Sequence, residues 1–456
     1  ALIRLMLMQR QLDAARGWNT AGFVSGYRGS PLGAFDLQLS KAKPLLAAHH
    51  IEFMPAINED LAAAACVGTQ QIAKDPKRTV DGVHALWYGK GPGLDRAGDA
   101  IKHGNASGSS PRGGVLVVVG DDHGCVSSSM PYQSDVAFQA WSMPVVHPAN
   151  VAEYLEFGLY GWALSRFAGC WVGFKAISEV VESGMTVDLD RVLLAFEQHV
   201  PYTPPACGLH SRWPEVPSPS IEERVVARLQ ATRAFARVNS IDRHIVSSPN
   251  ATLGIITVGK AHFDFMEVLR RLDLDPDALS AAGVRIYKVG LVWPLEPTRI
   301  DEFAQGLEEI LVIEEKAPIV EQQLKELLYA RPDSQRPRIA GKLGPRGEPL
   351  VPSIGELRPS RMIAVVAEWL ARLNPALDRR HLVVDFTMPK LLSNEGDSVK
   401  RTPYFCAGCP HSTSTKLPEG SRAIAGIGCH FMASWMKRET GGFLQMGGEG
   451  VDWVAP

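Results

Sequence analysis

Residues 114–124 read GVLVVVGDDHG, a short apolar run that ends in a glycine-rich turn. The same arrangement occurs at 83–93, where VHALWY precedes GKGPG, and at 22–33, where GFVSG leads into YRGSPLG. Short runs that are apolar on both faces are typical of strands in a parallel sheet that is covered by helices. We therefore predict an α/β fold for residues 20–200, with ligand-binding loops at the carboxyl ends of its strands.

Proline and glycine divide the rest of the chain into further segments. Six prolines in residues 201–219 predict an extended linker, because proline breaks helices and removes strand donors. A helix rich in arginine and alanine is expected at 220–239, and a second α/β pattern follows at 252–373. Within that pattern, the basic segment 331–349 is predicted as a solvent-exposed loop, because proline and glycine keep its charges off a common face.

The composition of the 456 residues excludes several classes of function. Apolar residues make up 45% of the chain, which is enough for two or three domain cores. The formal charge of -2 leaves no general basic surface for nucleic acid or anionic membranes. No apolar run approaches the roughly 18 to 20 residues of a membrane span, and the first residues lack a signal-peptide pattern, so a cytoplasmic location is expected.

Both ends of the chain read as interior sequence. Residues 1–11 resemble the middle of an amphipathic helix, and residues 446–456 stop in a glycine-rich turn, so a longer polypeptide is expected. Four of the seven cysteines are scattered, which predicts a reducing compartment and small core positions for Cys66, Cys125, Cys170 and Cys207.

The remaining cysteines are crowded together. Cys406 and Cys409 have the C-x-x-C spacing of two metal ligands on one turn, and Cys429 follows after 19 intervening residues. A thioredoxin-type pair would leave Cys429 unexplained, a zinc site would add His411 or His430, and an iron-sulfur cluster needs a fourth cysteine. Spacing therefore predicts a metal site, with zinc slightly ahead of iron-sulfur.

An acidic group precedes an alanine-rich stretch. Asn58, Glu59 and Asp60 come before LAAAACVGTQQ, where the helix dipole and the free N-terminal amides favour carboxylates. The residues alone favour a capping role. Because alanine lets another domain or subunit approach closely, an acid buried at an interface is the alternative.

Polar side chains occupy the turns that follow the predicted strands. Glycine lets the backbone of such a turn approach a ligand with its amides exposed. The turns place Arg28, Ser30, Lys90 and His123 at one edge of the sheet. This arrangement predicts a polar pocket for an anionic substrate.

Nine segments occur in an order that one family shares: YRGSPLG, NEDLAAAACVGTQ, WYGKGPGLDRAGD, GDDHG, GLVWPLEP, VIEEK, CAGCPHSTSTK, GIGCH and MGGEGVDW. They resemble the large fused indolepyruvate ferredoxin oxidoreductases, which are thiamine-diphosphate-dependent 2-oxoacid:acceptor oxidoreductases. The resemblance implies a parallel-sheet α/β fold that binds thiamine diphosphate. It assigns 1–245 to an aminopyrimidine-binding domain with a linker, 246–373 to a transketolase C-terminal-like domain, 374–401 to a linker and 402–456 to the incomplete start of a diphosphate-binding domain.

The resemblance implies roles for individual residues. Glu59 matches the family's carboxylate that shares a proton with N1′ of the aminopyrimidine, which favours removal of the thiazolium C2 proton. In the substrate-side loop, Arg28 could pair with the substrate carboxylate and Ser30 could donate to its carbonyl. That loop consists of Tyr27, Arg28, Gly29, Ser30 and Pro31, and further candidates for cofactor contact are Lys90, Gly91, His123, His411 and His430.

The resemblance also implies the cofactors and the reaction. Cys406, Cys409 and Cys429 match three ligands of a [4Fe-4S] cluster, and the fourth ligand and the motif for Mg²⁺ and diphosphate are expected downstream. An aryl 2-oxoacid such as indolepyruvate would be oxidised to an acyl-coenzyme A thioester, with electrons passing to ferredoxin or another low-potential acceptor in a homo- or hetero-oligomer. Open alternatives are a phenylpyruvate or branched-chain substrate, a non-oxidative decarboxylase with structural zinc, and a non-catalytic scaffold subunit.

Overall fold

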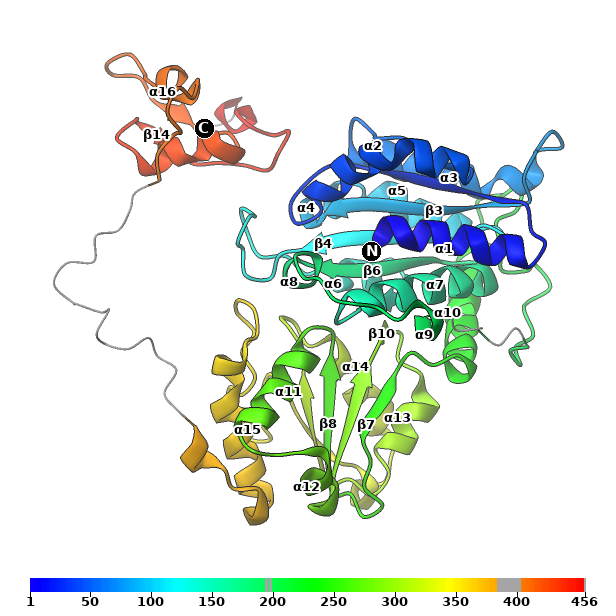
Figure 1. Cartoon of the computed structure of the whole chain (residues 1–456), viewed down its shortest axis with the longest axis vertical. Coiled ribbons are helices and arrows are strands. Elements are labelled where there is room, and N and C mark those ends of the chain that lie inside the picture. The colour runs from blue at the N-terminus through cyan, green and yellow to red at the C-terminus, as the bar shows by residue number, and fades with distance from the viewer. Residues whose placement is uncertain (193–195, 197–198, 384–402, 455–456) are drawn as a thin grey trace. The chain divides into compact units, whose positions relative to one another are not determined.

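The computed structural model describes residues 1–192, 196, 199–383 and 403–454. The chain divides into two compact units, Ala1–Val384 and Asp385–Pro456, and each is described by itself (Figure 1). No helix in the described ranges has the length and apolar character that a membrane span requires.

In the described part of the first unit, seven strands form one sheet: β1 (Thr20–Gly26), β2 (Ile51–Phe53), β3 (Gly82–Lys90), β4 (Val115–Asp121), β5 (Val145–Val146), β6 (Trp171–Ile177) and β10 (Leu291–Trp293). Their order across the sheet is β10-β5-β6-β4-β3-β1-β2. Neighbouring strands run parallel, except that β10 pairs antiparallel with β5. The predicted parallel α/β sheet is therefore confirmed.

Helices cover both faces of this sheet: α1 (Leu2–Ala15), α2 (Gly33–Ala48), α3 (Glu59–Gln70), η1 (Ile72–Lys74), α4 (Gly91–Arg96), α5 (Gly98–Ser107), α6 (Asp135–Ala140), α7 (Val151–Ala168), α8 (Ser178–Val181), α9 (Leu189–Val192) and α10 (Ser220–Val238). Because successive strand residues point to opposite faces, Leu116 packs with α1 and α7, whereas Val117 packs with α3 and α5. Residues 201–219 contain neither helix nor strand, and α10 starts directly after them, as the proline content predicted.

Five more strands in the described ranges form a second sheet: β7 (Arg243–Val246), β8 (Leu253–Val258), β9 (Val284–Val289), β11 (Glu309–Ile313) and β12 (Arg338–Ala340). Its order is β12-β11-β8-β9-β7, and only β7 runs antiparallel to its neighbour among these strands. Its helical elements are α11 (Ala261–Arg271), α12 (Pro276–Ala281), α13 (Pro297–Phe303), α14 (Ile319–Tyr329), η2 (Asp333–Gln335), α15 (Pro359–Leu373), η3 (Pro375–Leu377) and η4 (Arg380–Leu382).

Two short strands differ from the sequence interpretation. The chain leaves β9 through Gly290 and immediately enters the first sheet as β10, so the two sheets lie in one continuous unit. The prediction that 331–349 is wholly an exposed loop was wrong at β12, where Ile339 and Ala340 pair with β11 and Ala340 is fully buried. The boundaries predicted at 245 and 373 stay predictions.

The second unit has a small core in its described part. Its elements are α16 (His411–Ser414), β13 (Ala423–Ile424), the 3-10 helix η6 (Gly428–Trp435), β14 (Thr440–Gly441) and η7 (Val451–Val454). β13 and β14 pair in parallel. Among the described residues of this unit, the buried apolar side chains are those of Phe405, Ala425 and Ala433.

Candidate functional site

The predicted turns lie at one edge of the first sheet. The loop 27–31 follows β1, Lys90 is the last residue of β3, and His123 comes two residues after β4. Because β1, β3 and β4 are consecutive parallel neighbours in the sheet, their carboxyl ends lie next to one another (Figure 1). These residues therefore lie at one edge of the sheet, as the sequence predicted.

Ser127 connects two of these turns. Its hydroxyl lies 2.7 Å from the hydroxyl of Ser30, and its carbonyl accepts a 2.9 Å hydrogen bond from the Lys90 ammonium. Burial lowers the pKa of Lys90, and the charge of Asp122 opposes this shift. Ser127 could not be identified from the sequence, because a serine in the run SSS carries no signal for contacts with residues far away in the chain.

The substrate-side loop is fixed at both ends and open between them. The backbone N–H of Tyr27 donates to the carbonyl of Tyr88 over 3.1 Å. Pro31 is buried, and its ring occupies the space that a side chain on Gly120 would need. Gly29 lies so close to Lys90 that an added Cβ would be 3.2 Å from the Cβ of Lys90. Arg28 is exposed between these fixed points, so its guanidinium is available to a ligand.

Glu59 is not needed as the cap of α3. The side chain of Asn58 accepts the N–H of Leu61 over 2.9 Å and so caps this helix. The Glu59 backbone carbonyl accepts a 3.1 Å hydrogen bond from the Trp87 indole. Glu59 is 9% exposed as a residue, and its carboxyl group lies against Gly93, where an added Cβ would be 2.6 Å from Oε1. Asn58 therefore caps the helix, and the Glu59 carboxylate is available for another role.

His123 occupies a different position from Arg28 and Ser30. It is completely buried, with Nδ1 3.3 Å from Oε2 of Glu315 and Nε2 4.0 Å from Oδ2 of Asp121. Burial raises the pKa of the Glu315 carboxyl, but His123, the Lys260 ammonium and the N–H of Leu357 together outweigh this effect, so the pKa lies below its ordinary value. These contacts favour a structural connection between the two sheets over direct contact of His123 with a ligand.

Gly91 is required by packing. It is buried at the start of α4, and the ring of Tyr132 lies where its side chain would be, 2.1 Å from an added Cβ. The segment after β4 therefore folds over the turn after β3. This close approach explains the glycine without any contact to a cofactor.

The predicted metal ligands lie in the second unit. Cys409 Sγ is 3.3 Å from Nδ1 of His411, and the His411 ring stacks on Phe405 with centroids 5.2 Å apart. The ring centroids of His411 and His430 are 5.9 Å apart, and Nδ1 of His430 accepts the N–H of Gly426. These contacts bring the turn that carries Cys409 toward the one that precedes His430.

The donor set has the chemistry of a soft-metal site but is not gathered around one point. Cys406, Cys409 and Cys429 are all free thiols. Among the described residues, no three His, Cys, Asp or Glu side chains are arranged so that they could hold a metal ion. The metal-ligand assignment therefore stays a prediction from the sequence.

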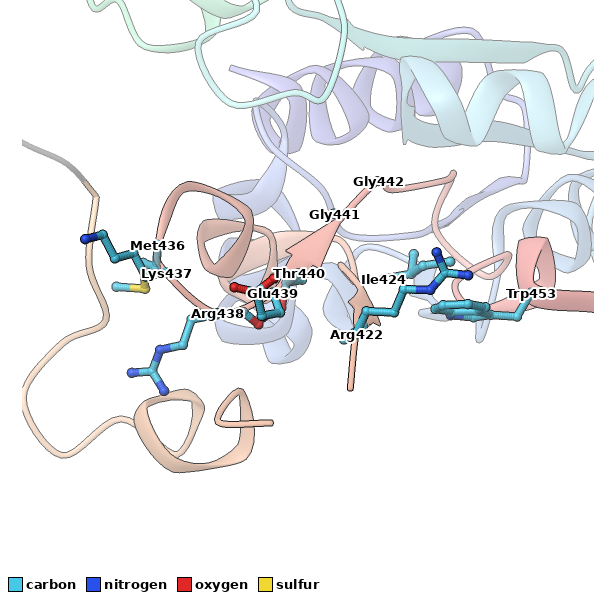
Figure 2. Close-up of a pocket in the computed structure, with 11 residues that line it drawn as sticks. Arg422, Ile424, Met436, Lys437, Arg438, Glu439, Thr440, Gly441, Gly442 and Trp453 are labelled. Carbon is cyan, nitrogen blue, oxygen red and sulfur yellow. The ribbon is translucent and has the colours of Figure 1, made fainter. Parts of the chain in front are cut away.

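A cavity of about 670 Å³ opens in the second unit. Figure 2 shows its basic side chains, of which Arg422 lies over the ring of Trp453 at 4.8 Å. This cavity could not be predicted from the sequence, because its residues come from separate short elements. The cavity is lined by Arg422, Ala423, Ile424, Met436, Lys437, Arg438, Glu439, Thr440, Gly441, Gly442 and Trp453.

Comparisons with known proteins agree with the motifs. Residues 242–384 match the family model of the indolepyruvate ferredoxin oxidoreductase middle domain. The chain is 27% identical over 363 residues to the indolepyruvate oxidoreductase subunit IorA of Pyrococcus abyssi, a match that covers 76% of this chain and 51% of that protein. The same subunit of Archaeoglobus fulgidus is 24% identical over 409 residues, which are 88% of this chain and 58% of the relative.

A solved structure shares the fold. It is a 2-oxoglutarate:ferredoxin oxidoreductase from Magnetococcus marinus with 2-oxoglutarate, coenzyme A and succinyl-CoA bound. It aligns with a TM-score of 0.52 and 15% identity, over 79% of this chain and 64% of that one. The predicted fold class, a parallel-sheet α/β fold, is confirmed. The chain spans about half the length of the curated relatives it matches, 51% for the Pyrococcus abyssi protein.

Proposed function

Since this chain is a relative of the indolepyruvate ferredoxin oxidoreductases, we propose that it takes part in the oxidation of an aryl 2-oxoacid to an acyl-coenzyme A thioester. The electrons would pass one at a time, through an iron-sulfur cluster, to ferredoxin or another low-potential acceptor. The observation that carries the proposal is Glu59, a residue that is 9% exposed and is not needed to cap its helix because Asn58 does so.

Glu59 fits the carboxylate that thiamine diphosphate requires. When bound, this cofactor supplies the carbon nucleophile and the electron sink for a 2-oxoacid. The role of Glu59 would be to share a proton with the aminopyrimidine ring at N1′. Within the described part of the chain, no residue forms an ion pair or hydrogen bond with the Glu59 carboxylate, so it is free to make this contact.

The cations at the sheet edge suit an anionic substrate. Arg28 presents an exposed guanidinium, which can bind a carboxylate with two parallel hydrogen bonds. Lys90 and Ser30 are held beside it through Ser127. Arg28 would bind the 2-oxoacid carboxylate, and Ser30 would donate to the carbonyl oxygen.

Apolar side chains around Glu59 support assembly with another domain or chain. Ile57 is 81% exposed and Leu61 is 51% exposed, and they flank the acid in sequence. A covering surface would remove both from water and exclude solvent from the carboxylate. We infer a homo- or hetero-oligomer, and we propose a cytoplasmic location, in line with the scattered cysteines Cys66, Cys125, Cys170 and Cys207, which form no disulfide.

The cluster ligands are proposed from donor chemistry. Cys406, Cys409 and Cys429 would supply three thiolates, which are the ligands that iron-sulfur clusters use. No described residue is assigned to Mg²⁺ or to the diphosphate. The identity of the 2-oxoacid is left to a substrate panel of indolepyruvate, phenylpyruvate and branched-chain 2-oxoacids.

The proposal is tested by anaerobic turnover of the intact natural polypeptide. Thiamine diphosphate, Mg²⁺, coenzyme A and a one-electron acceptor are supplied with each 2-oxoacid, and thioester, aldehyde and reduced acceptor are measured. Glu59→Gln should lower kcat by about 100-fold or more, because it removes the proton-sharing group. Asp60→Asn is the matched control, since Asp60 pairs with Arg96 at the surface, 3.6 Å away. The proposal would be overturned if aldehyde formed without reduction of the acceptor, or if no 2-oxoacid gave a product. Equal effects of Glu59→Gln and Asp60→Asn would also overturn it.

A further inference from the structure

One loop joins the candidate site to the second sheet. Residues 122–134 run from the end of β4 to the start of α6. The front of this loop carries Ser127, which contacts Ser30 and Lys90 at the sheet edge. Its two ends carry His123 and Gln133, which contact the segment 315–317 after β11. The loop therefore lies between the proposed substrate side chains and the second sheet.

The front of the loop is held in one shape by Asp122. Its carboxylate accepts the N–H of Val126 over 2.9 Å and the N–H of Ser127 over 2.8 Å. The hydroxyl of Ser128 donates to the same carboxylate over 2.9 Å. Because Ser127 is fixed relative to Asp122, a movement of His123, the next residue, is transmitted to the serine that holds Lys90.

The second sheet holds the ends of the loop. Glu315 approaches Nδ1 of His123 to 3.3 Å and also accepts the N–H of Leu357 at 3.0 to 3.1 Å. Gln133 accepts the N–H of Ala317 over 2.9 Å and donates to its carbonyl over 3.4 Å. His123 and Glu315 are both buried, so water cannot substitute for this contact. The position of the loop is thus defined by residues of the second sheet.

The structure assigns His123 and Glu315 as positioning residues: they fix the 122–134 loop and, through Ser127, hold Lys90 and Ser30 in place for an anionic substrate. This inference rests on the proposed function. It gives the second sheet a role in substrate binding, although none of its described residues lies in the substrate-side loop. If His123 and Glu315 contributed to folding stability alone, replacing them would not specifically change the position of Ser127. A positioning role and a purely structural role can therefore be distinguished by measurement.

The test compares Glu315→Gln and His123→Leu with a matched control in the intact protein. Glu153→Gln is that control, because Glu153 forms a buried ion pair with Lys288 of β9 and does not touch the loop. Hydrogen exchange of the amides of Val126 and Ser127 is measured first, since it needs no activity. Both test variants should exchange about tenfold faster there, and the control should match the wild type.

Kinetics provide the second readout. The test variants should raise the KM for the 2-oxoacid about tenfold while kcat changes less than about threefold, because binding is affected more than chemistry. Gln133→Ala leaves His123 and Glu315 unchanged and should change exchange and KM in the same direction. It takes the place of any test variant that fails to fold. The inference is overturned if the exchange rates or the KM of the test variants do not differ from those of the Glu153→Gln control. Absence of turnover in the wild type would reject the proposed function instead, and the exchange result would still decide whether the loop is coupled to the second sheet.

Discussion

Gly93 offers a way to displace Glu59 without unfolding the protein. In Gly93→Ala the new Cβ would lie 2.6 Å from Oε1 and 2.7 Å from Cγ of Glu59, closer than real Cβ atoms come to any neighbour. Reaching an ordinary contact of 3.4 Å requires the Glu59 side chain to move by about 0.7 to 0.8 Å, the difference between these separations. Only the side chain needs to move, since the clash does not involve the α3 backbone.

The expected cost in stability is small. Alanine is more favourable than glycine in a helix by up to about 1 kcal/mol, although α4 is short. A Glu59 side chain pushed about 30° from its rotamer costs roughly 0.5 to 1.5 kcal/mol, so the two effects nearly cancel. The expected cost in rate is larger, because a misplacement of about 1 Å at a reacting group can lower the rate about 100-fold. This corresponds to about 2.7 kcal/mol in the activation barrier.

The assay combines thermal unfolding with turnover of the 2-oxoacid. Gly68→Ala is the control, because Gly68 lies in the same helix as Glu59 and has open space around it. The control should keep wild-type kcat, while Gly93→Ala should lose most of it at a similar unfolding temperature. A Gly93→Ala protein with wild-type kcat would refute the assignment of Glu59. A Gly93→Ala protein with a clearly lower unfolding temperature than the wild type would refute the stability argument.

The other predictions concern separate parts of the molecule. Arg28→Ala should raise the KM for the 2-oxoacid about tenfold with little change in kcat, because a bidentate carboxylate contact is lost; an unchanged KM contradicts this role. Replacing Cys406 or Cys429 with serine should lower bound iron, measured by elemental analysis, and weaken a broad absorption band near roughly 400 nm; full retention of iron would exclude them as ligands. Burial, with the adjoining Glu356 carboxyl, raises the pKa of Glu179 to about 7. Between the unfolded value of 4.5 and about 7 the folded protein therefore binds more protons at Glu179, so its contribution to the free energy of unfolding falls as the pH rises. Glu179→Gln should flatten that slope in chemical unfolding, and an unchanged slope would show that other groups cause it.

The strands that the sequence predicted correctly are the ones with strong local signals. β3 and β4 are long, apolar on both faces and followed by glycine-rich turns, so their type and position were readable. β10 and β12 have three residues each, and their pairing depends on partners far away in the chain. A segment of three residues has no periodicity to detect, which is why the segment around β12 read as a loop.

The candidate site divides along the same line. Local patterns predicted that Glu59 lies at the start of a helix and that Arg28 follows a strand. The contact of Ser127 with Ser30 joins residues that are 97 positions apart, and no local pattern encodes it. The adjacent acids Glu314 and Glu315 also looked equivalent in the sequence. Glu314 accepts the backbone N–H groups at the start of α14, while Glu315 faces His123, because neighbouring side chains after β11 point in different directions.

Three buried ion pairs of the first unit differ in their surroundings from two charged residues of the candidate site. Removing a charge from water is costly unless an opposite charge and hydrogen bonds replace the solvent. Three buried cations of this unit, Arg166, Lys175 and Lys288, obey this rule through an oppositely charged partner, whereas the buried Arg228 donates to backbone carbonyls instead. Glu59 and the half-buried Lys90 do not, because within the described part of the chain neither has an oppositely charged side chain within 4.0 Å. Under the proposed function, an aminopyrimidine would pair with Glu59 and an anionic substrate with Lys90. The paired ones are Arg166 with Asp13, Lys175 with Asp135 and Lys288 with Glu153.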